Sequence, residues 1–197
     1  MGAEFGTVPD LAGPSGKEIY MAGALEQVVE LFRAKDWKFE VDEENDLVRT
    51  GIQGENGDWQ VMAAASENDP AFLMLSFFPQ KCPAHRRASC AELLTRINFG
   101  MMVGCFEMDY DSGRIHCKTT LPFAQGALDP AILNNVVMFN LACMDWFLPA
   151  IMSVIYAGTS PAKALAAVDC DKKGKPGSRT KKATNLQELV RRRFLFN

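Results

Sequence analysis

Several signatures of enzymes are missing from this 197-residue sequence. It has two histidines and no Cys-x-x-Cys pair, so a four-ligand zinc site has few side chains to draw on. It also has no glycine-rich phosphate loop, because neither Gly54–Gly57 nor Gly100–Gly104 stands between a strand and a helix. We interpret both glycine pairs as turns and expect no catalytic, cofactor-binding or metal-binding residues.

A hydrophobic secretory signal is also lacking. The first sixteen residues contain four glycines and two prolines but no apolar run, so we expect residues 1–16 to be a disordered or artificial leader. Six cysteines are spread along the chain without the close spacings of a disulfide framework. Reduced thiols are typical of the cytosol, and we therefore expect a cytoplasmic protein.

Positive charge is scarce in the body of the chain. Residues 172–197 carry nine Lys or Arg and one Glu, which leaves 12 basic and 23 acidic side chains in residues 1–171, a net charge of −11. Phosphate binding depends on clustered Lys and Arg, so nucleic acid is an unexpected partner for the body. If nucleic acid is bound at all, we expect the contact in the basic tail, within Lys172–Arg193.

Composition and periodicity predict one domain over residues 17–168, followed by a basic tail, 169–197. Apolar residues make up 48% of the chain and charged residues 23%, as in ordinary globular proteins. The patterns predict an α+β fold in the order α-β-β-β-α-β-β-α with an antiparallel sheet. The expected elements are a helix over 17–35, strand-like runs over 37–52, 59–65 and 71–78, a helix over 84–98, strands over 103–110 and 114–121, a helix over 130–156, a short helix over 161–168 and a last short helix over 185–194 in the tail.

Burial can be predicted from the residue pattern of one strand-like run and of one hairpin. The run Phe72–Phe78 is apolar at almost every position, so we expect it to lie centrally in the sheet and to be covered on both sides. In the hairpin over 103–121, apolar and polar residues alternate. Cys105, Glu107 and Asp109 are expected on a solvent-exposed face, which they share with Arg114, His116 and Lys118 of the neighbouring strand.

The segment 136–158 is apolar almost throughout and approaches the length of a membrane span. Asp145 near its middle and Pro149 beside it argue against insertion, so we expect no membrane contact and interpret the segment as a helix buried on two sides. One stripe, from Val137 to Ile155, can pack on the sheet. The second stripe needs another cover, which is the helix 17–35, a second copy of the chain or a client. We predict that this stripe and Phe77 contain the partner-binding or dimer residues, namely Val136, Phe139, Cys143, Phe147, Ile151 and Phe77.

Possible metal and thiol chemistry has weak support. Cys82-x-x-His85 supplies two ligands of a tetrahedral site, and the adjacent His116 and Cys117 point to opposite faces of a strand. Cys105 and His116 share a face and could form a nucleophile pair, but on this solvent-exposed face cross-strand pairing with a carboxylate explains His116 better.

Three stretches resemble the bacterial YbjN-like family of sensory transduction regulators. They are Trp37–Glu40 with the following VRTGIQGENGDWQVMA, then RINFGMMVGCFEMDYDSGRIHCKTTLP, and MDWFLPAIMSVIYAGTSPAKAL. Within them, Asn98, Gly104-x-Phe106-Glu107, Asp111-x-Gly113 and Lys118-Thr119-Thr120 look like the middle signature of that family. The resemblance implies a fold similar to type III secretion chaperones, which often dimerise and bind clients along exposed apolar grooves. It supplies no catalytic residues.

The function that we predict from the sequence is therefore a non-catalytic protein-binding module, chaperone-like or regulatory, acting as a homodimer on an unidentified protein client. Two alternatives remain open at this point. One is a cysteine-dependent enzyme that uses Cys105 or Cys90, and the other is a nucleic-acid-associated protein that uses its basic tail.

Overall fold

A computed structural model describes residues 16–42, 44–65, 70–123 and 129–174. The predicted tail helix over 185–194 and nearly all of the expected leader lie outside these residues. The elements in chain order are α1 (Gly16–Ala34), β1 (Phe39–Asp42), β2 (Leu47–Gln53), β3 (Asp58–Ala65), β4 (Ala71–Phe77), η1 (Ala84–Arg86), α2 (Arg87–Gly100), β5 (Cys105–Met108), β6 (Ile115–Pro122), α3 (Pro130–Tyr156) and α4 (Pro161–Gly174).

The strands form one antiparallel sheet in the order β1-β2-β3-β4-β6-β5. This confirms the predicted α+β class. The run expected over 37–52 is two strands, because a tight turn follows Asp42, whose carboxylate accepts hydrogen bonds from the backbone and side-chain nitrogens of Asn45. Asp46 takes a positive φ of 49° in the same turn, a conformation that Asp tolerates better than most residues.

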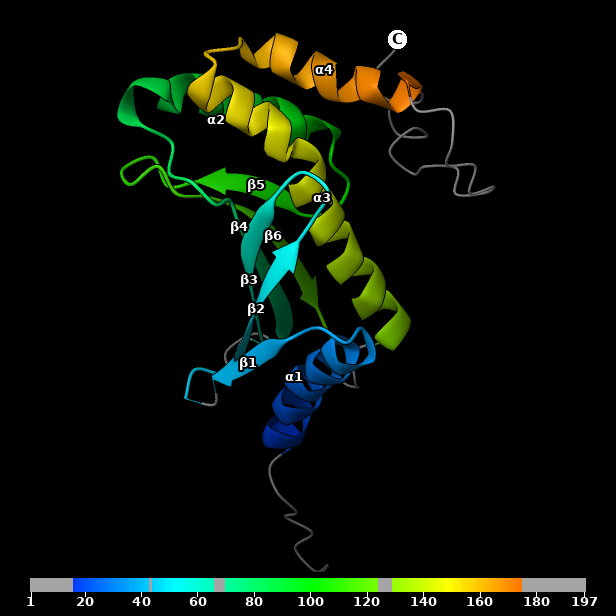
Figure 1. The fold of residues 1–197 in the computed structure, drawn as a ribbon. Helices are drawn as coiled ribbons and strands as arrows, with labels where there is room; N and C mark the ends of the chain where they lie inside the picture. Colours follow the sequence, from blue (N-terminus) through cyan, green and yellow to red (C-terminus); the bar gives the residue numbers. More distant parts are fainter. Residues whose placement is uncertain (1–15, 43, 66–69, 124–128, 175–197) are drawn as a thin grey trace, which may run out of the picture.

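The helices contact the sheet from one side. Figure 1 shows α3 along this side, with α1 near its lower end and α2 and α4 near its upper end. The core forms between α3 and alternate residues of the central strands, and its largest fully buried side chains include Phe72, Met74, Ile115 and Met144. Burial of this kind stabilises a domain by about 1.5–3 kcal/mol for each large apolar side chain.

Local sequence explains where α3 begins and ends. Asp129 caps it by accepting hydrogen bonds from the backbone nitrogens of Ala131 at 2.7 Å and Ile132 at 3.1 Å, and Pro130 takes the first helical position. Gly158, at a φ of 64°, follows its last turn.

The composition and length of α3 would suit a membrane span, yet it is the central core helix of this domain. Its one internal carboxylate has a structural partner, because Asp145 accepts a hydrogen bond of 2.8 Å from the backbone nitrogen of Asn56 in the β2–β3 turn. The side chain of Asn56 in turn donates to the backbone oxygen of Asp145 at 3.1 Å. Asp145 therefore ties the sheet to α3.

The stripe predicted to pack on the sheet is buried, from Val137 through Leu141, Met144 and Leu148 to Ile155. Towards the C-terminal end of α3, the second side is covered by α2 and α4, which contact α3 and each other. From the sequence we expected this cover to be the helix 17–35, a second copy or a client. The structure shows that the helix after Pro161, which extends further than predicted, supplies much of it.

The expectation that β4 is covered on both sides is wrong for the described part of a single chain. β4 is central, as predicted, but only Phe72, Met74 and Ser76 are buried, whereas the residues between them are half-buried. An apolar residue pattern shows that both faces of a strand avoid water. It does not show whether the second cover belongs to the same molecule.

Candidate protein-binding surface

The side of the sheet opposite α3 is called the open face here, because no described helix packs on it. Residues that pair across neighbouring strands share a face, so the strand registers define its members. They are Glu40 and Asp42 on β1; Leu47, Arg49, Gly51 and Gln53 on β2; Asp58, Gln60, Met62 and Ala64 on β3; Ala71, Leu73, Leu75 and Phe77 on β4; His116, Lys118, Thr120 and Pro122 on β6; and Cys105 and Glu107 on β5.

The middle of the open face is apolar. Met62, Leu73, Leu75 and Phe77 are half-buried, and none of them belongs to the hydrophobic core or packs against it. We call these four residues the central strip. A hollow of about 550 Å³ lies at its Phe77 end and is lined by parts of β2, β3 and β4. A contiguous apolar area bordered by polar residues is typical of a protein-binding surface.

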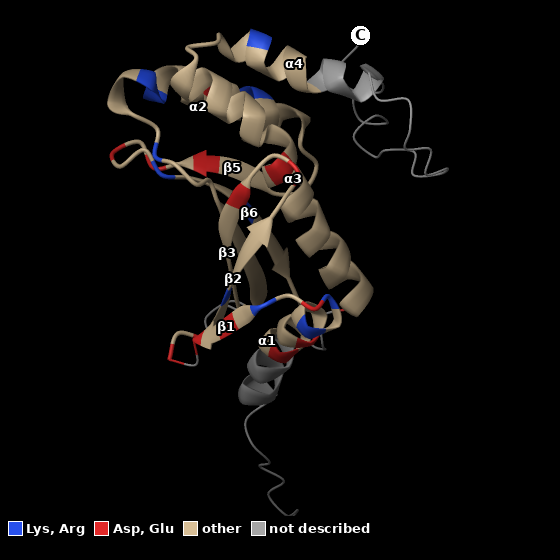
Figure 2. Cartoon of the chain, viewed as in Figure 1, with Lys and Arg blue, Asp and Glu red and all other residues tan. Residues whose placement is uncertain are grey.

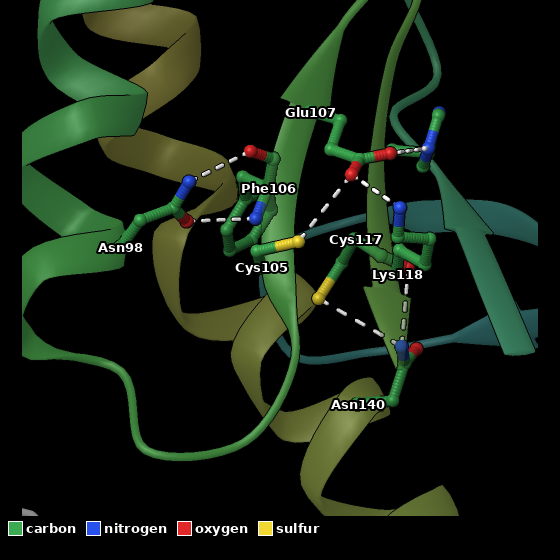
Figure 3. Close-up of polar contacts among 8 residues, drawn as sticks. Asn98, Cys105, Phe106, Glu107, Cys117, Lys118 and Asn140 are labelled. Atoms are coloured by element: carbon green, nitrogen blue, oxygen red, sulfur yellow. Dashed lines mark hydrogen bonds and ion pairs between the residues drawn. The ribbon is translucent and has the colours of Figure 1, made fainter. Parts of the chain in front are cut away.

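One border of the central strip is a polar cluster around Glu107. Its carboxylate lies 3.0 Å from the Nε2 atom of His116 and forms an ion pair with Lys118 on the neighbouring strand, as Figure 3 shows for Lys118. Burial alone would raise the pKa of the Glu107 carboxyl, but hydrogen bonds from Lys118 and His116 outweigh it and hold that pKa below its usual value. Glu107 is therefore an anion at neutral pH.

The alternative in which Cys105 and His116 form a catalytic dyad is not supported by this geometry. The Sγ atom of Cys105 lies 3.6 Å from Glu107, and His116 is engaged by the same carboxylate. Burial and the charge of Glu107 raise the pKa of the Cys105 thiol, with Lys118 offsetting part of the shift. A reactive cysteine needs the opposite, a stabilised thiolate.

The other cysteines are less suited to nucleophilic chemistry. Cys90 is fully buried, and burial raises the pKa of its thiol to about 12. Cys82 lies against it, also buried, with its pKa raised for the same reason. In the described part of the chain, no group of three or more His, Cys, Asp or Glu side chains is arranged to hold a metal ion.

The opposite border of the central strip lies on β1 and β2. Arg49 forms an ion pair with Asp42 at 3.1 Å, and Glu40 is its cross-strand neighbour. In Figure 2, acidic residues mark β1 and β5, near the two ends of the strand order, whereas β4 carries no charge. The open face thus has an apolar centre between two charged borders.

The edge of the sheet at β5 is closed by a side chain. Asn98 of α2 donates from Nδ2 to the backbone oxygen of Phe106 at 2.8 Å and accepts from the backbone nitrogen of Phe106 at 2.7 Å (Figure 3). Both hydrogen-bonding groups of that edge residue are occupied. Another strand cannot pair with them without displacing Asn98.

Beneath the open face, a buried polar network joins the sheet to α3. Asn140 of α3 accepts from the hydroxyl of Ser76 at 2.6 Å and donates to Thr119 at 2.9 Å and to the backbone oxygen of Cys117 at 3.1 Å. Trp59 donates to the same Ser76 hydroxyl at 3.2 Å. Figure 3 shows the Asn140 side chain directed at Cys117. These contacts hold the strands of the central strip on a rigid support.

The predicted partner-binding residues fall into three environments. Phe77 lies on the open face, with its ring centroid 6.0 Å from that of His116. Val136, Phe139 and Phe147 are half-buried on α3 and pack against the core, and Phe147 meets the ring of Phe106. Cys143 and Ile151 are buried within the chain. The role of all six as partner-binding residues stays a prediction.

Sequence reasoning missed three of the four residues of the central strip. Leu73 and Leu75 were expected to be covered with the rest of Phe72–Phe78, because a central strand flanked by apolar neighbours is usually buried, and Met62 was given no role. Their signal was the alternation itself: residues 73, 75 and 77 are apolar like residues 72 and 74. The described helices all lie on the other side of the sheet, so none of them covers this second face.

A family model described as "Putative bacterial sensory transduction regulator", with the name YbjN, matches residues 24–151. The match includes every strand and the long helix up to its last turn. It agrees with the resemblance noted in the three sequence stretches.

Among solved structures, the chain is similar to one described as "Crystal Structure of the ExsC-ExsE Complex". The two share 12% sequence identity with a TM-score of 0.42, over 65% of this chain and 92% of the other. At that level of similarity no property of the complex is transferred to this chain. No curated protein matches the sequence.

Proposed function

Since this chain belongs to the YbjN family, we propose that it is a non-catalytic protein-binding module, chaperone-like or regulatory, which acts as a homodimer and holds a protein on its open face. The observation that carries this proposal is the central strip. Four apolar side chains on the two middle strands have no cover among the described residues of the chain.

A protein partner fits this surface better than a small ligand does. The central strip lies on the exposed face of a sheet, and protein interfaces combine such an apolar centre with a polar rim. Small-molecule sites are enclosed pockets that bury most of their ligand. The borders of the strip are polar and partly neutralised, because Glu107 pairs with Lys118 and Asp42 pairs with Arg49.

Two features support a role without catalysis. Cys105, the most accessible thiol of the five described cysteines, has a raised pKa, and the histidine beside it is held by a carboxylate. The free, unpaired state of the five described cysteines also supports our expectation of a reducing, cytoplasmic location.

The proposal is tested by placing the photo-crosslinking residue p-benzoylphenylalanine at Leu75 and irradiating the protein in lysate of its source. The matched control carries the same residue at Ala166, which is exposed on α4, a helix that does not pack on the open face. We expect discrete protein adducts, either with a client or with a second copy, from position 75.

Excess unlabelled wild-type protein should suppress these adducts, and an excess of the Leu75→Glu variant should not. Adducts at position 75 no more abundant than those at position 166 would refute a binding role for the open face.

A further inference from the structure

We propose that the protein on the open face is a second copy of this chain, packed sheet against sheet with β4 of both copies along the twofold axis. The inference rests on the proposed function, because it names the occupant of the same surface. It adds a specific arrangement, which the strand registers make testable.

The choice of β4 follows from its side chains. Every open-face residue of β4 is apolar, namely Ala71, Leu73, Leu75 and Phe77, and no other strand has this property. In a symmetric dimer, residues on the axis meet their own copies. Apolar groups are favoured there because like charges would meet like charges. An axis along β4 is therefore the arrangement that buries the most apolar surface without opposing equal charges at its centre.

The strand order then determines which borders meet. With β4 on the axis, β3 of one copy faces β6 of the other, and β2 faces β5. Arg49 on β2 thereby lies over the part of β5 that carries Cys105 and Glu107. The guanidinium of Arg49 and the carboxylate of Glu107 have opposite charges. The side chain of Arg49 is half exposed and pairs with Asp42, so in the dimer Glu107 of the other copy adds a second carboxylate partner.

The overlapping area suits a specific dimer. Five strands from β2 to β5, at a spacing of about 4.8 Å and with an average length of about seven residues at about 3.3 Å each, cover roughly 24 by 23 Å. This corresponds to about 550 Å² per copy and about 1,100 Å² in total. Specific interfaces begin near ~1,000 Å², so such a dimer would be stable but of modest size.

Pairing through the sheet edge at β5 is the main structural alternative, and Asn98 disfavours it. The side chain of Asn98 already occupies the backbone nitrogen and oxygen of Phe106 at that edge. A second copy that extended the sheet there would have to break both hydrogen bonds. Packing on the open face breaks none of the contacts within the chain.

A crosslinking experiment tests the axis directly. In a Cys105→Ser, Cys170→Ser background, Leu75→Cys places one accessible thiol on the proposed axis, because the other four cysteines are buried. We expect a short bismaleimide to join position 75 of one copy to position 75 of another in most of the protein. The control Ala166→Cys in the same background should remain monomeric on denaturing gels.

Sedimentation of the purified protein gives the second measurement. We expect the wild type to dimerise in the micromolar range and Leu75→Glu to raise the dissociation constant at least about 30-fold, as expected when a central interface residue is lost. Ala166→Glu should leave the constant unchanged. Circular dichroism checks that each variant is folded, and the crosslinking result remains decisive if Leu75→Glu is not.

Three outcomes would overturn the inference. A wild-type protein that stays monomeric at about 100 µM without crosslinking at position 75 excludes the dimer. A dimer that dissociates in Val136→Glu but persists in Leu75→Glu places the interface on α3. Photo-crosslinks from p-benzoylphenylalanine at position 75 to residues 175–197 of the same chain identify the tail as the occupant.

The two proposals fail separately. If the purified protein is monomeric but position 75 still yields specific adducts with another protein in lysate, the protein-binding role of the open face stands, whereas the homodimer and the second copy as its occupant are wrong. If neither a dimer nor an adduct forms, the binding function fails as well.

Discussion

The two faces of β4 differ although they are built from alternate residues of the same seven-residue strand. On one face, Phe72, Met74 and Ser76 are buried beneath α3. On the other face, Leu73, Leu75 and Phe77 are equally apolar but remain half-buried. Chemical composition therefore does not separate the faces. Only the position of the helices does.

The helix-covered face of the sheet stabilises the fold, whereas the open face is available for binding. The helix-covered face contains the large buried side chains and the Asn140 network, so most of the stabilisation of the fold resides there. The open face contributes apolar area that folding of one chain leaves uncovered. Such a surface tends to be retained where a partner covers it, because an exposed apolar strand on a sheet is otherwise a site of aggregation.

The largest expected effect comes from truncating adjacent residues of β4. Met74→Ala, at a fully buried position, should lower the free energy of unfolding by about 3 kcal/mol, since it leaves a cavity. Leu75→Ala should cost about 1 kcal/mol or less, because its side chain faces away from the core.

Urea denaturation at a protein concentration below the dimer range measures both variants. Equal losses for Met74→Ala and Leu75→Ala would show that the two faces do not differ in the way described above.

The next effect concerns the support beneath the strip. Asn140→Ala should lower the free energy of unfolding by about 2–3 kcal/mol, because Ser76, Thr119 and the Cys117 carbonyl lose a buried partner. Asn135→Ala, at an exposed position of the same helix, is the matched control and should change stability little. Similar thermal unfolding for Asn140→Ala and Asn135→Ala would argue against a structural role for the network.

A smaller effect is expected for the polar border of the open face. The pKa of Glu107 is lower in the folded chain than its usual value of about 4.5, so its pairing stabilises the fold above that pH and is lost as the pH falls through the folded pKa. Because Glu107 is partly exposed, Glu107→Gln should cost at most about 1 kcal/mol at pH 7.

This difference between Glu107→Gln and the wild type should disappear at a pH low enough to protonate Glu107 in both states. Denaturation curves at pH 7 and at successively lower pH provide the measurement. A cost that is independent of pH would mean that Glu107 acts through packing alone.

The smallest effect is on thiol reactivity. The carboxylate of Glu107 helps to raise the pKa of Cys105, so Glu107→Gln should lower that pKa and accelerate alkylation of Cys105, on the order of threefold at pH 8. Mass spectrometry of peptides labelled with iodoacetamide follows this rate, with buried Cys117 as the internal control that reacts slowly in both proteins. Rapid labelling of Cys105 in the wild type would instead revive the thiol-enzyme hypothesis.

Much of the fold was predictable because its signals are local. The cap of α3 by Asp129 and Pro130 was visible in two adjacent residues, and the wet and dry faces of the β5–β6 hairpin followed from strict alternation. The division of 37–52 into β1 and β2 was missed, since the acidic turn after Asp42 continues the polar character of its surroundings. Of the predicted partner residues, Phe77 lies on the open face and Cys143 and Ile151 lie in the core, and the partner-binding role of all six stays a prediction.

By itself, the sequence determined that β4 and α3 avoid water on nearly all sides, because apolar transfer free energy is a property of each side chain. Which neighbour provides the cover was decided by the tertiary structure. The helices α2 and α4 cover the second side of α3 near its C-terminal end, whereas no described helix covers the second face of the sheet. Such contacts between residues far apart in the chain depend on how whole elements pack, and residue periodicity does not contain that information.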